Sequence, residues 1–294
     1  MKASYPARHQ RTNRMRPYRA RRHSGIVRHI VWACAAAFLY ITAANAHATE
    51  GERILIEYVE PGQPAHRPLY DALKEHRVLE RVRDLLSPVR WPQPLRLEVK
   101  GCDGDSNAWY ADATVTFCYE YVEEIWTRAD SATRPAAITR DDAFVGPLLE
   151  VFLHEASHAL FDMLKIPLLG REEDAADQLA AYYVLQLPHE TKRNLILAGA
   201  WAHASELKVR RARDLHRPRL QVTRHITFAD EHGTTAQRLY NLLCIAYGSD
   251  KQLFADVVEQ GFLPQERADV CESEYHQVDF AYRALISPHT DSGR

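Results

Sequence analysis

Two histidines and a glutamate in the stretch LLEVFLHEASHALFDML have the types and spacing that a metal site requires. His154 and His158 lie four residues apart, so on a helix both imidazoles project from one face within reach of a single ion. Glu155 is rotated by about 100° from His154, which places it beside that ion, where it can hold a water. Apolar neighbours would bury these polar groups, which costs free energy of folding, and a functional role would explain why the sequence keeps them. The pattern predicts a zinc site with its general base.

A third ligand is expected in REEDAADQLAAYY, which we interpret as a second helix after the turn IPLLG. Glu173 would complete a site of two histidines and one glutamate that leaves a fourth position for water. Asp177, one turn later, would accept the outer N–H of a ligating histidine. Glu172 and Asp174 are alternative ligands, although acids here also suit the start of a helix, where the dipole favours them. Asp162 is a weaker alternative.

The whole stretch HEASHALFDMLKIPLLGREEDAADQ resembles the gluzincins, the thermolysin-like metallopeptidases in which HExxH is followed by a glutamate ligand and a supporting aspartate. It is also similar to an uncharacterised bacterial metallopeptidase family with HEAxHAL followed by GREEDxAD. That second resemblance continues through SNAWYADATVTFCYE, DEHGTTAQRLYNLLCIAYGSD and LPQERADVCESEY, and departs at Ser157, where glycine is common. Both resemblances imply peptide hydrolysis by a zinc-held water, with one Zn²⁺ per chain and Glu155 as general base.

The resemblance also implies residues that contact the substrate. Asn107 and Ala108 in NAWY are similar to the edge segment that thermolysin-like enzymes lay beside the substrate backbone, where an extended peptide binds by β-augmentation. A turn closed by a disulfide is the alternative interpretation. His232 in FADEHGT is the first candidate for the second catalytic role, donation to the oxyanion, ahead of Tyr240 and Arg238. A surface histidine is the alternative for His232.

Residues 1–48 are typical of a secretory signal peptide. They contain nine Lys or Arg and no acid, and the apolar run 30–44 is shorter than the roughly 20 residues that span a bilayer. Small residues provide an A-x-A cleavage site after Ala46 or Ala48. An uncleaved anchor is the alternative. We expect an exported protein, periplasmic or secreted, with no stable membrane anchor after cleavage.

Four cysteines remain in the mature chain, and in an exported protein they allow three disulfide pairings. Proximity in the sequence favours Cys102–Cys118 and Cys244–Cys271, each closing a loop worth roughly 3 kcal/mol. A four-thiolate zinc site is the alternative, but it lacks any C-x-x-C pair.

Charge restricts the partners. Without the basic leader, 28 basic and 39 acidic residues remain, a net charge of −11, which argues against a nucleic-acid binder. We therefore expect a peptide or protein substrate. The alternatives are an inactive zinc-binding envelope protein that serves as a peptide-binding module, and a structural envelope protein in which the motif is coincidental.

Hydrophobic periodicity predicts one α+β domain over residues 49–294, with a small N-terminal sheet and a mostly helical C-terminal half that carries a zincin-like active-site helix. Strands are expected at 53–60, within 94–102 and at 114–118, with an extended segment at 107–110. Leu and Val recur at helical spacing from 67 to the residue before Pro88. Later helices are expected at 142–165, 171–187, 188–207, 235–247, 250–260 and 265–285, and KVRRARDLHRPR is interpreted as a basic exposed turn or face.

Overall fold

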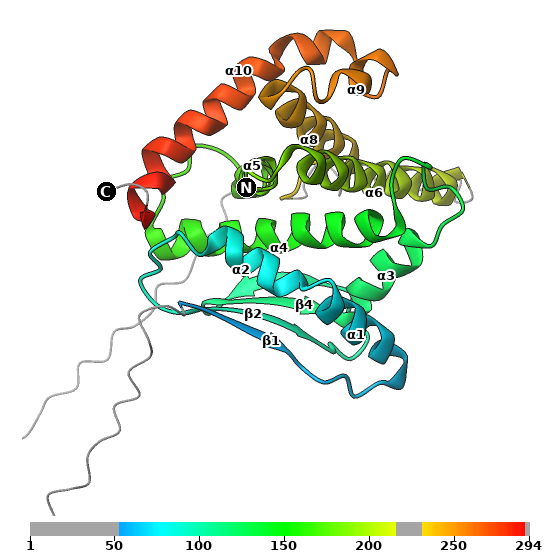
Figure 1. The fold of residues 1–294 in the computed structure, drawn as a ribbon, viewed down its shortest axis with the longest axis vertical. Coiled ribbons are helices and arrows are strands. Elements are labelled where there is room, and N and C mark those ends of the chain that lie inside the picture. Colours follow the sequence, from blue (N-terminus) through cyan, green and yellow to red (C-terminus); the bar gives the residue numbers. More distant parts are fainter. Residues whose placement is uncertain (1–52, 216–230, 292–294) are drawn as a thin grey trace, which may run out of the picture. The chain divides into compact units, whose positions relative to one another are not determined.

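A computed structural model describes residues 53–215 and 231–291 (Figure 1). The expected signal peptide lies outside the described residues. Four short strands form one mixed sheet in the order β1-β2-β4-β3. They are β1 (Ile54–Tyr58), β2 (Leu95–Lys100), β3 (Ala108–Ala111) and β4 (Thr114–Cys118). β1, β2 and β4 are parallel, and β3 pairs with β4 antiparallel at one edge of the sheet.

The helices of the N-terminal half pack around this sheet. They are α1 (Arg67–Glu75), α2 (Val78–Leu86) and α3 (Tyr119–Ala129). The helical pattern expected from 67 onward is divided into α1 and α2, because Arg77 between them has a positive φ of 52°, which no α-helix continues. Leu73, Leu79, Val82 and Leu86 are fully buried, so both helices present their apolar side to the core.

The central helix, α4 (Arg140–Leu164), carries the HExxH motif. Figure 1 shows it between the sheet and the helices of the C-terminal half, and it contacts β3, β4, α2, α3, α5 and α6. Thr139 caps its N-terminus by accepting from the Asp142 amide, and Lys165 ends it in the left-handed conformation. Phe144, Phe152 and Leu160 are fully buried on it. A helix enclosed in this way has little freedom to shift its polar residues.

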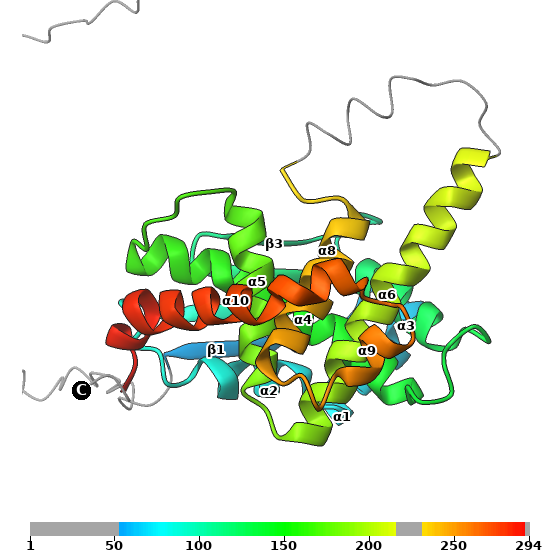
Figure 2. The same ribbon diagram turned by 90° about the horizontal axis from the view of Figure 1, so that it is seen from above.

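The C-terminal half is helical. It consists of α5 (Glu172–Leu185), α6 (His189–Leu215), α8 (Thr235–Ser249), α9 (Ala255–Glu259) and α10 (Gln265–Ala281), followed by a π-turn at Tyr282–Ile286 and a 3₁₀ turn at Ser287–His289. Figure 2 shows α10 crossing over α5 and α8. The expected α+β class is confirmed: a small sheet followed by a mostly helical half.

The largest differences from the expected helix boundaries are in α6 and α9. α6 continues to Leu215, beyond the expected end at 207, because the Lys, Arg, Ala and Leu of KVRRARDL are strong helix formers. α9 is confined to Ala255–Glu259 instead of 250–260. None of the described helices combines the length and apolar character that crossing a bilayer needs.

Both expected disulfides are present. Cys102–Cys118 ties the segment before β3 to the end of β4, and Cys244–Cys271 joins α8 to α10. Gly248 allows that second contact, because a Cβ at this position would come within 2.1 Å of the Cys271 carbonyl oxygen. α8 is therefore held closely against α10.

Candidate metal site

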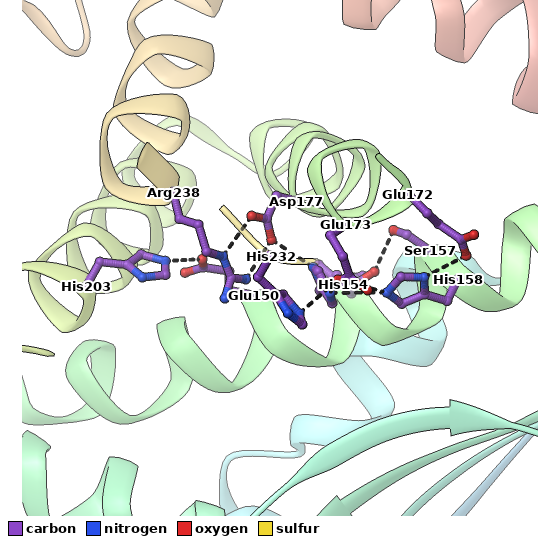
Figure 3. Close-up of polar contacts among 11 residues, drawn as sticks. Glu150, His154, Ser157, His158, Glu172, Glu173, Asp177, His203, His232 and Arg238 are labelled. Carbon is purple, nitrogen blue, oxygen red and sulfur yellow. Dashed lines mark hydrogen bonds and ion pairs between the residues drawn. The ribbon is translucent and has the colours of Figure 1, made fainter. Parts of the chain in front are cut away.

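His154 and His158 project from one side of α4 and direct the same ring nitrogen toward each other (Figure 3). Their Nε2 atoms are 3.2 Å apart. His154 is buried, and His158 is partly buried. The four-residue spacing thus brings two ring nitrogens together at the edge of the core, as the sequence predicts for one turn of helix.

Glu173, in the first turn of α5, approaches the same point. Its Oε2 lies 3.0 Å from His154 Nε2 and 3.5 Å from His158 Nε2. Ligand atoms about 2.0–2.1 Å from a tetrahedral zinc ion are roughly 3.3 Å from one another. The three donors, which all lie within 4.8 Å of one another, therefore fit the edges of such a site.

Two further carboxylates hold the outer nitrogens of the histidines. His154 Nδ1 is 2.8 Å from Asp177 Oδ1, and His158 Nδ1 is 2.8 Å from Glu172 Oε1. Because a carboxylate accepts, each Nδ1 carries a proton, which leaves Nε2 as the nitrogen that a metal ion would take at the common point. Asp177 was predicted to orient a histidine of the site, and Glu172 makes the corresponding contact with the other histidine.

The three adjacent acids in EED make different contacts. Glu173 reaches both histidine Nε2 atoms, while Glu172 contacts only the far side of His158. Asp174 pairs with Arg171 at 2.7 Å. Asp162, the weaker alternative on α4, bonds to the hydroxyl of Tyr110 and to Lys165. The geometry therefore leaves Glu173 as the carboxylate placed to meet the histidines.

Charges around the site shift the pKa values of these groups. Burial alone would lower the pKa of His154, but hydrogen bonds to Asp177 and Glu173 outweigh it and raise the pKa to about 9. The hydrogen bond from His154 lowers the pKa of Glu173 to about 2, against the effect of burial. Burial would raise the pKa of Asp177, but the bonds from His154 and Arg238 hold it well below its usual range. Glu173 and Asp177 are therefore ionised at neutral pH.

Glu155 follows His154 on α4 and is partly buried. Burial raises its pKa, which the charges of His154 and His158 oppose and that of Glu173 reinforces. A carboxylate with a raised pKa is a stronger base than an exposed one. Its surroundings thus have the character that proton transfer needs.

His232, on the segment that precedes α8, also approaches the carboxylate of Glu173. Its Nε2 is 2.8 Å from Glu173 Oε2, and its ring is stacked at 5.8 Å on that of His154. With 46% of its side chain exposed, it borders both the site and the solvent.

The predicted substrate-contacting residues lie at the outer edge of the sheet. Asn107 precedes β3, and its side chain accepts from the backbone amide of Ala108, the first residue of the strand. β3 is bonded to β4 on one side and lies against α4, where Tyr110 donates to Asp162. The edge segment and the metal helix are therefore neighbours.

A second layer of polar groups lies behind the site, and its contacts were not predicted from the sequence, where Arg238 is only a candidate donor to the oxyanion. Arg238 of α8 donates to both oxygens of Asp177, at 2.8 and 2.6 Å. Glu150, one turn before His154, accepts from His203 of α6 at 2.6 Å (Figure 3). One signal was available: Glu150 continues the four-residue stripe of His154 and His158. The partners from α6 and α8 are more than fifty residues away in the sequence and carry no such signal.

Comparisons with known proteins give one family. No curated protein and no solved structure matches the chain. The model of the family DUF4344, described as "Putative metallopeptidase", matches residues 58–286, which include α4, α5 and α8. Since this match covers well over half of the chain, the protein belongs to that metallopeptidase family.

Proposed function

We propose that the protein is an exported zinc-dependent peptidase with a gluzincin-like site. The observation that carries the proposal is the convergence of His154 Nε2, His158 Nε2 and Glu173 Oε2 at separations of 3.0–3.5 Å, with an acceptor behind each histidine. Two imidazoles and one carboxylate are a donor set found in catalytic zinc sites, where a fourth position is left open for water. The two disulfides are compatible with export.

In this proposal, His154, His158 and Glu173 would hold a zinc ion, which would supply a Lewis acid for the scissile carbonyl and for the attacking water. Glu155 takes the proton of that water and delivers it to the leaving amine. His232, at the solvent border of the site, donates to the oxyanion as the carbonyl carbon becomes tetrahedral. The edge of β3 beginning at Asn107 and Ala108 holds the peptide backbone in an extended form.

Glu155→Gln tests the chemistry. The variant keeps the size and hydrogen-bonding capacity of the side chain but cannot accept a proton at neutral pH. We expect full-length Glu155→Gln, purified without a histidine tag, to contain as much zinc as wild type and to cleave fluorescein-labelled casein at least about 100-fold more slowly. Asp174→Asn, which changes a nearby acid that pairs with Arg171, serves as the control and retains activity.

The alternative is an inactive zinc-binding protein that captures peptides. In that case wild type would hold one zinc per chain and cleave no casein, and Glu155→Gln would behave identically. Equal cleavage by both proteins would remove Glu155 from the mechanism. A chain without stoichiometric zinc would reject both functions.

A further inference from the structure

Arg238 is a charged residue next to the proposed metal site whose role the proposed function leaves open. Its guanidinium is held by two hydrogen bonds to Asp177, 2.8 Å to Oδ2 and 2.6 Å to Oδ1, and Asp177 Oδ1 in turn accepts from His154 Nδ1. Only 23% of the Arg238 side chain and 16% of that of Asp177 are exposed. A bidentate, largely buried pair fixes a carboxylate far more firmly than a surface ion pair does.

Arg238 also faces Glu150, whose negative charge acts on its guanidinium. Glu150, Arg238 and Asp177 line one cavity of about 10 Å³ between α4, α5 and α8, which is room for a single water. Glu150 itself is held by His203 at 2.6 Å, and its second oxygen occupies the space above Gly199, where a Cβ would lie 2.4 Å away. The guanidinium thus lies between two partly buried carboxylates, which belong to the helices that carry the proposed metal donors.

We infer that Arg238 is a positioning residue for the metal site: it fixes the carboxylate of Asp177, and through it the ring of His154, while Glu150 and His203 keep the guanidinium in place. This role differs from donation to the oxyanion, for which Arg238 is a sequence-based candidate. Figure 3 shows its guanidinium directed at Asp177, whose Oδ1 contacts the outer nitrogen of His154. The inference rests on the metal site of the proposed function but not on catalysis.

The test measures zinc affinity in the full-length protein by competition with a chromogenic chelator. Loss of a partner that orients a metal ligand typically lowers metal affinity 10- to 100-fold. We expect Arg238→Met to weaken zinc binding by about this factor, and Arg238→Lys, which keeps the charge but loses the fork, to recover part of it. Glu150→Gln is expected to weaken binding by a smaller factor.

Arg193 provides a matched control. It forms a bidentate pair with Asp256 at 3.0 and 2.9 Å, with 25% and 33% of the two side chains exposed, away from the metal donors. Arg193→Met therefore removes an ion pair of similar geometry and should lower the melting temperature without changing zinc affinity. If both methionine variants weaken zinc binding equally, the effect is loss of stability and the positioning role is rejected.

A double-mutant cycle tests whether Arg238 affects zinc affinity through Asp177. If Arg238 acts through Asp177, then Arg238→Met has little further effect on zinc affinity once Asp177 is changed to Asn. Full additivity, or wild-type affinity in Arg238→Met, overturns the inference. Should Arg238→Met fail to fold, Arg238→Lys and Glu150→Gln decide by the same criterion. Failure of the wild type to cleave casein while it binds zinc rejects the peptidase but leaves this inference standing.

Discussion

At the scale of single residues, the spacing of His154 and His158 predicts most of the site. A helix converts a separation of four into one shared face, so the two Nε2 atoms can come within 3.2 Å of each other. Glu172 shows where this reasoning stops. Its acidic type suits a helix start regardless of its neighbours, so only the packing of α5 on α4 reveals its contact with His158.

Glu172 is expected to matter for the metal. Glu172→Ala removes the acceptor at 2.8 Å from His158 Nδ1 and frees the ring to rotate, so zinc affinity should fall about 10-fold. Chelator competition checks this. Asp174→Ala is the neighbouring control on the same turn and should leave the affinity unchanged; a similar loss in both variants would mean that the charge of the helix start, not the hydrogen bond, is responsible.

The pKa of His154 gives metal-free protein a defined pH dependence. Because the folded value of about 9 exceeds the unfolded value near 6.5, the stabilisation is complete below about pH 6.5 and is lost as the pH rises through 9. Glu173, at about 2, contributes stability above about pH 4.5 that is lost toward pH 2. Melting temperatures after chelation should therefore decline between pH 6.5 and 9. Asp177→Asn should flatten that decline, and an unchanged slope would contradict the assignment.

At the scale of elements, the packing of helices brings together residues that no sequence pattern connects. α4 and α5 are joined by a short turn, and the motif therefore predicts their pairing in part. α8 follows much later, yet it delivers Arg238 to Asp177 across 61 positions. Its position depends on α10, to which Cys244–Cys271 and the contact at Gly248 hold it.

Gly248→Ala tests that packing. An added methyl group would overlap the Cys271 carbonyl oxygen at 2.1 Å, so α8 and α10 must separate, at a cost of about 1–3 kcal/mol. Urea unfolding measures the loss. Gly62→Ala, where no heavy atom lies within 4 Å of the new Cβ, is the control and should be near neutral. A Gly248→Ala protein as stable as wild type would show that the helices adjust without strain.

At the scale of the whole molecule, sequence periodicity predicts a small sheet followed by helices, and the structure confirms it. The sheet order and the depth of α4 could not be predicted in this way, because they follow from contacts between distant segments. The proposed metal donors come from α4 and α5, and the polar contacts behind them extend to α6 and α8. The proposed metal binding would thereby be linked to the packing of four helices.

Zinc should accordingly stabilise the entire described fold. A ligand at 100 times its dissociation constant adds about 2.7 kcal/mol, which for a domain of this size corresponds to a rise of roughly 5–10 °C in melting temperature. Scanning calorimetry of the full chain with zinc and after EDTA treatment measures this difference. A His154→Ala protein should show no response to either, and an equal response in that variant would place the metal elsewhere.

The most direct test of the central claim, that His154, His158 and Glu173 hold one metal ion, is zinc X-ray absorption spectroscopy on the full-length protein purified without a histidine tag. The account predicts one zinc per chain, with two imidazole nitrogens at about 2.0–2.1 Å and carboxylate or water oxygens at about 2.0–2.2 Å, and a lost imidazole contribution in His158→Ala. Sulfur ligands near 2.3 Å, or a spectrum that His158→Ala leaves unchanged, would contradict it.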